Sequence, residues 1–241
     1  MSVATATDLT FPASTGRPMR AALALPPVAG PRPAVIVIHE IFGLNGDIRR
    51  IAGRVADLGY VALAPDLYDT GGPRALCVLR TMLALRRGEG PAFADLEAAR
   101  TFLAVRPEVD AARTGVVGFC MGGGFALLYA VQAPLRVAGA FYGDVPSTSE
   151  ELKGVCPVLG GFGGRDRIFA AQGRRLESHL TALGVPHDVR IYPDAGHSYM
   201  SKHTGVMATL GAWGPIAAGY DPAAEADSWT RMETFFRTHL G

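Results

Sequence analysis

Three side chains that together can perform nucleophilic catalysis lie far apart in the sequence: Cys120, Asp166 and His197. The cysteine stands in Gly-Phe-Cys-Met-Gly at residues 118–122, a G-x-nucleophile-x-G pattern in which sulfur replaces the more common serine hydroxyl. An imidazole can take the thiol proton and later pass it to a leaving group, and a carboxylate can hold that ring in one tautomer. These residue types therefore predict a triad in which a thiol attacks a carbonyl and forms an acyl-enzyme.

The glycines that flank the cysteine have a physical purpose of their own. A strand that turns directly into a helix strains the backbone at the turn, and neighbours with side chains would collide there. The helix N-terminus that follows favours a thiolate and, later in the reaction, an oxyanion. Glycine-rich turns between a strand and a helix also cradle phosphates, so the motif by itself leaves a phosphate site open.

Alternating strand and helix patterns predict the scaffold that positions these side chains. An unbroken β-branched run such as residues 34–38 is typical of a parallel strand buried on both faces. Strands are predicted at 9–11, 19–25, 34–38, 60–64, 114–119, 137–142, 155–162 and 189–192, and helices at 47–58, 76–85, 92–105, 170–183 and 227–239, with a further helical pattern after the cysteine turn. The alternation favours the α/β class: a doubly wound, mostly parallel sheet, helices on both faces, and a single domain over residues 1–241.

The order of the three side chains along this scaffold is informative. Cys120, Asp166 and His197 each follow a predicted strand, and ligands of such sheets bind beyond the carboxyl ends of the strands. Nucleophile, acid and histidine in this order are expected of α/β hydrolases. Taken singly, each has a plainer explanation, as a small buried cysteine, a turn aspartate and a loop histidine. A peroxide-reactive thiol protein without a C-x-x-C partner, and a hydrolase-fold binding protein without catalysis, also stay open.

The composition is that of a globular protein with balanced charge. The chain has 241 residues, of which 49% are hydrophobic and 19% charged, and its formal net charge is +1. This charge gives no reason to expect nucleic acid or an anionic membrane as a partner. Three scattered cysteines are too few for a disulfide framework or a zinc site, and neither metal nor cofactor is expected. No signal-type segment or membrane-spanning run is recognisable, which predicts a cytoplasmic protein. We expect a monomer or a small homo-oligomer.

Four segments of the chain resemble the dienelactone hydrolase family. They are His-Glu-Ile-Phe-Gly-Leu-Asn at 39–45, Ala-Pro-Asp-Leu-Tyr at 64–68, Gly-Phe-Cys-Met-Gly-Gly at 118–123 and Ala-Gly-His-Ser-Tyr at 195–199. The resemblance extends from about residue 8 to the C-terminus, and the first and third segments are its most specific parts. Members that carry this cysteine hydrolyse dienelactones to maleylacetate without a metal or cofactor.

This resemblance implies a role for each matching residue. It assigns the nucleophile, the base and the orienting acid to Cys120, His197 and Asp166. It also implies that Glu40 contacts the resting thiol and helps to release its proton when substrate arrives. The backbone N–H groups of Met121 and Ile41 would then form the oxyanion hole.

A carboxylate beside the thiol also has an independent rationale. Charge repulsion would keep the sulfur protonated, and less prone to oxidation, until something displaces the carboxylate. The plainer alternative for Glu40 is a solvated loop position or an acid at a helix N-terminus. Other reactive side chains are interpreted as non-catalytic: His39 as structural, His187 and His203 as surface residues, and Cys77 and Cys156 as packing residues.

The residues that would contact the substrate depart from the family pattern. Family members hold the substrate carboxylate with arginines, one of them four residues after the catalytic histidine, where this chain has Ser201 followed by Lys202. The predicted substrate-binding residues are Tyr68, Arg74, Arg80, Tyr199 and Lys202. The long connection 201–226 is expected to border or cover the pocket. We expect a hydrolase of a small ester or lactone, and a dienelactone hydrolase proper and a general carboxylesterase both stay open.

Overall fold

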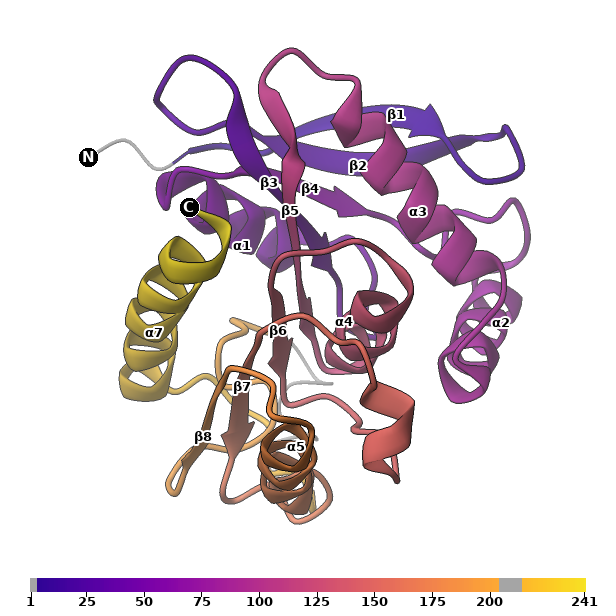
Figure 1. Ribbon diagram of the computed structural model, residues 1–241. Helices are drawn as coiled ribbons and strands as arrows, with labels where there is room; N and C mark the ends of the chain where they lie inside the picture. Colours follow the sequence, from indigo (N-terminus) through magenta and orange to yellow (C-terminus); the bar gives the residue numbers. More distant parts are fainter. Residues whose placement is uncertain (1–3, 204–213) are drawn as a thin grey trace.

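A computed structural model shows the architecture of the chain and describes residues 4–203 and 214–241. Its strands form one eight-stranded sheet in the order β1-β2-β4-β3-β5-β6-β7-β8 (Figure 1). The bounds are β1 Thr7–Pro12, β2 Pro18–Ala24, β3 Arg32–Ile38, β4 Val61–Pro65, β5 Val109–Phe119, β6 Ala138–Phe141, β7 Val158–Gly163 and β8 His187–Tyr192. The pairs β1–β2 and β2–β4 are antiparallel, and all other pairs are parallel.

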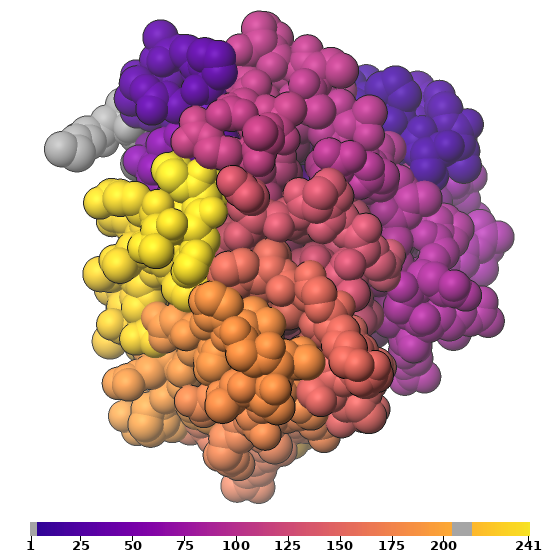
Figure 2. All heavy atoms as spheres, viewed as in Figure 1, coloured from indigo at the N-terminus to yellow at the C-terminus, as the bar shows by residue number. Residues whose placement is uncertain are grey.

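Helices cover both faces of this sheet (Figure 1). They are α1 Gly46–Asp57, α2 Arg74–Arg87, α3 Pro91–Ala104, α4 Met121–Gln132, the short 3₁₀ helix η1 Ser149–Leu152, α5 Ala170–Leu183 and α7 Pro222–Leu240. Helices α2 to α5 pack on one face, and α1 and α7 pack on the other. Figure 2 shows α7, in yellow, covering one flank of the molecule, and its contacts there are with β5 and β7. The predicted connection 201–226 extends over residues 204–213, which lie outside the described residues.

The side chains of the central strand β3 are buried on both faces of the sheet, as its apolar sequence predicts. Ala34, Ile36 and Ile38 belong to the core on the α2–α5 side. Val35 and Val37 point the other way, into the core formed with α1 and α7. All five side chains are fully buried, because helices cover both faces of a parallel sheet. The predicted doubly wound α/β-hydrolase fold with helices on both faces is confirmed.

Two elements begin five residues earlier than the sequence predicts. Strand β5 begins at Val109 instead of residue 114, because Arg32 of β3 still pairs with Val109 across a register shift. This early part of β5 is partly exposed and lacks the apolar run from which strands are recognised. Helix α7 begins at Pro222 instead of residue 227, since the Asp221 carboxylate caps the first turn by accepting from two backbone N–H groups. The short helix η1 is not predicted at all.

The turn after β5 depends on glycines that let backbones approach one another closely. Cys120 occupies this turn with φ 53° and ψ −118°, a strained backbone for a residue with a side chain. A Cβ atom at Gly118 would lie 1.8 Å from the carbonyl oxygen of Gly122, and one at Gly122 would lie 2.3 Å from that of Ile38. Both approaches are too short for any side chain, so the two glycines determine the geometry of the turn.

Replacing the first of these glycines is therefore expected to disrupt the turn. We predict that Gly118→Ala lowers the free energy of unfolding by more than about 3 kcal/mol, beyond the usual cost of an overpacked core, because its Cβ meets backbone and not a flexible side chain. Urea denaturation measures this difference. The matched control is Gly46→Ala in the first turn of α1, where a Cβ meets no atom within 4 Å. Equal stability of the two variants would contradict the prediction.

Candidate active site

The three side chains of the predicted triad converge at one edge of the sheet. Strands β5, β6, β7 and β8 are neighbours and run parallel, so their carboxyl ends lie at the same edge (Figure 1). Cys120 lies at the turn between β5 and α4, Asp166 follows β7, and His197 follows β8. The sheet thereby brings together side chains that are 46 and 31 residues apart in the sequence.

Asp166 and His197 form a buried hydrogen-bonded pair. The Nδ1 atom of His197 lies 2.6 Å from Oδ2 of Asp166, and the aspartate side chain is fully buried. The other carboxylate oxygen, Oδ1, accepts hydrogen bonds of 3.0 Å from the backbone N–H groups of Ile168 and Phe169. Both oxygens are therefore occupied, which fixes the carboxylate and presents Nε2 of the imidazole to the opposite side.

Cys120 is close enough to the imidazole to influence its protonation. Burial lowers the pKa of His197, but the hydrogen-bonded Asp166 and the nearby Cys120 outweigh this effect and raise the pKa to about 10. The surroundings thus favour the imidazolium form, which stabilises a neighbouring thiolate. His197 is almost completely buried, whereas Cys120 is partly exposed. Cys120 is therefore the residue of this group with the greatest exposure to solvent.

The loop that carries His197 is held by the chain segment that follows residue 213. The backbone N–H of His197 donates to the carbonyl of Ile216 at 2.9 Å, and its carbonyl accepts from Gly219 at 3.0 Å. The ring is flanked by Tyr142 and Phe169, with centroid distances of 5.2 and 4.8 Å. The described part of the connection 201–226 thus borders the site, as the sequence predicts.

Glu40 is buried beside this group but has other partners than the thiol. Its side chain follows β3, and its residue is only 2% exposed. Oε1 accepts a hydrogen bond of 3.0 Å from the Ser201 hydroxyl, and Oε2 forms an ion pair with His203. Burial by itself would raise the pKa of Glu40, but His203 and the Ser198 hydroxyl hold it below its usual value. Within the described residues, the recorded contacts of this carboxylate do not include the Cys120 sulfur that the family resemblance implies.

The prediction that His203 is a surface residue is wrong. Its side chain is 19% exposed, its ring packs edge-on against Phe42 at 4.8 Å, and it pairs with the Glu40 carboxylate. A buried carboxylate requires a nearby positive charge, and this requirement is a tertiary one. The only signal in the sequence is the concentration of polar residues that follows His197. His187 makes local contacts with Val185 and Thr181, and His39 is fully buried between Tyr68 and the backbone N–H of Leu67.

The two predicted oxyanion donors lie in neighbouring backbone segments. Met121 is the first residue of α4, where helix N–H groups have no partner within the helix. Ile41 directly follows Glu40 at the end of β3. The Gly122 Cα lies so close to β3 that a Cβ there would be 2.8 Å from the carbonyl oxygen of His39. The start of α4 therefore lies directly against the end of β3.

Two of the predicted substrate-binding residues lie beside the cysteine turn. Tyr68 is buried, and its hydroxyl donates to the Sδ atom of Met121 at 3.3 Å. Burial and the nearby Cys120 raise the pKa of this tyrosine. The guanidinium of Arg74 lies 5.7 Å from the Tyr68 ring centroid and donates to the carbonyl of Phe42 at 2.6 Å. Arg74 is exposed, so it places a positive charge at the rim of this region.

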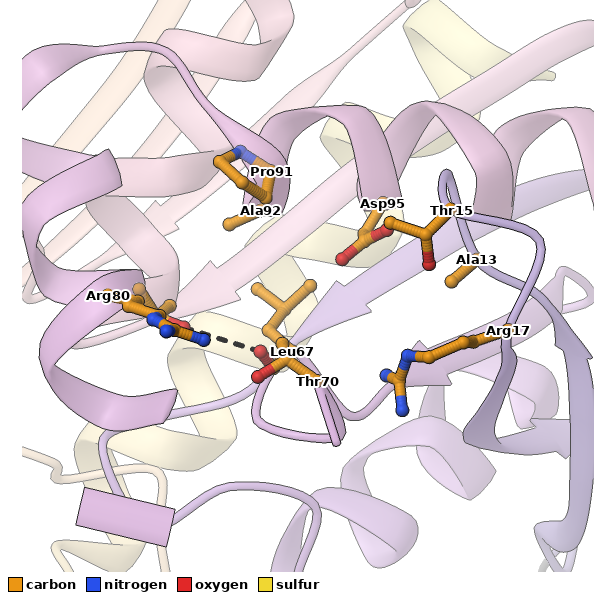
Figure 3. Close-up of a pocket in the computed structure, with 10 residues that line it drawn as sticks. Ala13, Thr15, Arg17, Leu67, Thr70, Arg80, Pro91, Ala92 and Asp95 are labelled. Carbon is orange, nitrogen blue, oxygen red and sulfur yellow. Dashed lines mark hydrogen bonds between the residues drawn. The ribbon is translucent and has the colours of Figure 1, made fainter. Parts of the chain in front are cut away.

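The other three predicted substrate-binding residues lie elsewhere. Arg80 lines a separate pocket with Arg17 and Asp95, and Figure 3 shows the two guanidinium groups on opposite sides of Leu67. Tyr199 is fully buried, and its hydroxyl is hydrogen-bonded to Ser228 at 2.9 Å, so it is a core residue behind the His197 loop. Lys202 is exposed, with its ammonium group 4.8 Å from the ring centroid of Tyr220.

The described part of the chain lacks both a cluster of potential metal ligands and a helix that could span a membrane. Within 4–203 and 214–241, no three or more His, Cys, Asp or Glu side chains are grouped as metal ligands. None of the helices in these ranges combines the length and the apolar character that crossing a membrane requires. The polar groups near Cys120 are engaged with one another, as the contacts of Asp166, His197 and Glu40 show.

The sheet order and the strained residue after β5 define the chain as an α/β hydrolase. More specifically, the chain belongs to the dienelactone hydrolase family, whose sequence model matches residues 19–240. It is an enzyme of the class that hydrolyses carboxylic esters and lactones.

Individual relatives extend over most of this chain. A protein of Methylorubrum extorquens named "Putative carboxymethylenebutenolidase" is 31% identical over 232 residues, which cover 90% of this chain and 75% of that protein. The crystal structure of a "Putative Dienelactone Hydrolase" from Klebsiella pneumoniae is similar with a TM-score of 0.77 and 27% identity, covering 98% of this chain and 99% of that one. A dienelactone hydrolase-like promiscuous phosphotriesterase from metagenomic libraries has a TM-score of 0.80 and 27% identity, with both chains covered completely.

The raised pKa of His197 leads to a testable prediction about Asp166. Asp166→Asn removes the buried negative charge, so the pKa of His197 is expected to fall well below 10. The folded-state pKa lies above the value of about 6.5 in an unfolded chain. The ionised pair therefore contributes stability that is complete below about pH 6.5 and is lost as the pH rises toward 10. NMR titration of the imidazole measures the pKa, and the exposed Asp194→Asn is the control. An unchanged titration in Asp166→Asn would contradict the prediction.

Proposed function

We propose that this enzyme hydrolyses a small ester or lactone through a Cys120–His197–Asp166 triad and an acyl-enzyme. The observation that carries the proposal is the hydrogen bond between Asp166 and the buried imidazole of His197, close to the partly exposed residue Cys120. A strained turn at the start of a helix positions this cysteine. This arrangement supports assigning nucleophile, base and orienting acid to Cys120, His197 and Asp166.

The reaction that we propose begins with attack of the sulfur on the carbonyl carbon. The thiol proton passes to Nε2 of His197, which gives the thiolate–imidazolium pair that the raised pKa of His197 favours. The thiolate then forms the carbon–sulfur bond as the carbonyl π electrons move to oxygen. The oxyanion would accept hydrogen bonds from the backbone N–H groups of Met121 and Ile41, each worth roughly 3 kcal/mol. The intermediate then collapses, the ester carbon–oxygen bond breaks, and the alkoxide takes the proton from His197. In a lactone this alkoxide stays attached to the acyl group.

Hydrolysis of the acyl-enzyme would repeat these steps with water as the nucleophile. His197 takes a proton from the water as its oxygen attacks the thioester carbon. Collapse of the second intermediate breaks the carbon–sulfur bond, returns the proton to the sulfur and releases the acid. Asp166 keeps Nδ1 of the ring as a donor throughout and stabilises the imidazolium in both halves of the reaction.

The substrate class is the part of the proposal with two candidates. Arg74 lies at the rim beside Tyr68, where a cation can bind a substrate carboxylate. This favours a lactone or ester that carries an acid group, in line with the names of the relatives. Ser201, in place of the family arginine, donates to Glu40 and brings no charge. Hydrolysis of neutral small esters, as in a general carboxylesterase, is therefore the second candidate.

We also propose that the enzyme acts in the cytoplasm, as a monomer or a small homo-oligomer. A reducing compartment keeps a partly exposed thiol available as a nucleophile. The structure has free thiols at Cys77, Cys120 and Cys156.

The first prediction from this mechanism concerns the nucleophile. Cys120→Ala is expected to abolish turnover of an activated aryl ester, because no other side chain at the turn can form the acyl-enzyme. Initial rates and mass spectrometry of the acylated protein measure the effect, and circular dichroism checks that the fold is intact. The control is Cys156→Ala, whose thiol has its pKa raised to about 12 by burial. Turnover that survives in Cys120→Ala would refute the mechanism, and peroxide consumption without esterase activity would favour a thiol redox protein.

A second prediction separates the two substrate candidates. Arg74→Gln is expected to raise KM about tenfold or more for a dienelactone with a free carboxylate, as loss of a charged hydrogen-bond partner does. It should leave KM for a neutral aryl ester nearly unchanged. Arg80→Gln is the matched control, since this arginine lines the separate pocket of Figure 3. Equal effects of Arg74→Gln on both substrates would exclude Arg74 as the carboxylate-binding residue.

A further inference from the structure

The Glu40 carboxylate is buried next to the catalytic group and needs compensation for its charge. It is 2% exposed, and an unpaired charge at such a depth is strongly unfavourable. Its Oε1 atom accepts from Ser201, whose hydroxyl also lies 3.2 Å from the hydroxyl of Tyr142. Hydroxyl groups supply hydrogen bonds but no positive charge. Among residues 4–203 and 214–241, the ion pair recorded for this carboxylate is with His203.

His203 reaches this carboxylate from the connection that follows β8. Its Nε2 atom pairs with Oε2 of Glu40, and its ring is packed edge-on against Phe42. Burial lowers the pKa of His203, but the Glu40 carboxylate outweighs this effect and raises it above its usual value. The other charged groups that act on the imidazole are Asp47 of α1, which favours the protonated form, and His197, which opposes it.

The pair is electrically linked to the reacting atoms. The charge of His197 helps to lower the pKa of Glu40. Burial raises the pKa of Tyr142, and the charges of Glu40 and Cys120 raise it further. Negative charge develops on the sulfur and then on the carbonyl oxygen in the reaction proposed above. An unpaired Glu40 carboxylate would oppose this charge, whereas a carboxylate paired with an imidazolium would not.

We propose that His203 is a positioning residue whose imidazolium neutralises Glu40 and holds this carboxylate on Ser201, away from the Cys120–His197 pair. The role in catalysis rests on the proposed function, but the pairing itself does not. Two carboxylate–imidazole pairs then share the site: Asp166 orients the base, and His203 removes the effect of Glu40 on the nucleophile.

The first test measures the pair without any substrate. NMR titration of the His203 imidazole in the intact protein should give a pKa above the ordinary value of about 6.5. In Glu40→Gln this pKa should fall to the ordinary value or below, because burial remains while the carboxylate charge is lost. A His203 titration that does not respond to Glu40→Gln would overturn the proposal.

The second test follows the reactivity of the Cys120 thiol. Iodoacetamide alkylation of Cys120 is measured against pH in the wild type, His203→Gln, Glu40→Gln and the double variant, with His187→Gln as the surface control. We expect His203→Gln to slow alkylation roughly tenfold near neutral pH and to shift the profile to higher pH, a change that one unit charge acting over roughly 10 Å can cause. The double variant should regain the wild-type profile, because no carboxylate is left to neutralise.

The outcomes of these tests are distinguishable from failure of the proposed function. A double variant that alkylates as slowly as His203→Gln alone would overturn the positioning role, even if Cys120→Ala is inactive toward esters. Esterase activity that survives in Cys120→Ala would refute the proposed triad. Recovery of the wild-type alkylation profile in the double variant would still support the Glu40–His203 pairing. Thermal unfolding of each variant checks that slow alkylation does not come from a loss of structure.

Discussion

The close approach of backbone at the turn after β5 is the constraint on which the rest of the site depends. Gly118, Gly122 and the carbonyl of Ile38 pack so tightly that no side chain fits between them. Cys120 is therefore held in a strained conformation at the first turn of α4. Such strain persists only where the surrounding structure imposes it, and here the sheet on one side and the helix on the other do so. Cys120 is thereby held at a defined place as a partly exposed residue close to the buried imidazole of His197.

Two carboxylate–imidazole pairs lie near this turn, and both histidines come from one connection. His197 pairs with Asp166, and six residues later His203 pairs with Glu40. The Tyr142 side chain links the two pairs, because its ring lies 5.2 Å from that of His197 and its hydroxyl contacts Ser201, which donates to Glu40. Each carboxylate is buried with a partner that can carry positive charge, which satisfies the requirement for burying two acids near a nucleophile. The connection after β8 thus supplies the base and also the compensation for Glu40.

The differences from the family pattern concern the surroundings of the Glu40 carboxylate. The resemblance implies an arginine four residues after the catalytic histidine and a carboxylate in contact with the thiol. This chain has Ser201 at that position, and Glu40 instead contacts Ser201 and His203. An imidazole gains and loses its proton in the pH range where enzymes work, so the charge that compensates Glu40 depends on pH. The positive charge at the rim is left to Arg74, beside Tyr68.

The sequence alone determined the fold class and predicted Cys120, Asp166 and His197 as one group. Apolar runs such as residues 34–38 require a sheet covered on both faces, and glycines at 118 and 122 are needed for a strained turn at any site of this kind. Periodicity and turn chemistry are local, so they can be read without coordinates. The partner of Glu40 was decided only by the tertiary structure, as were the core position of Tyr199 and the separation of Arg80 from Arg74. These depend on which side chains meet when segments up to about 160 residues apart pack together, and no local pattern records the charge that a buried carboxylate will find.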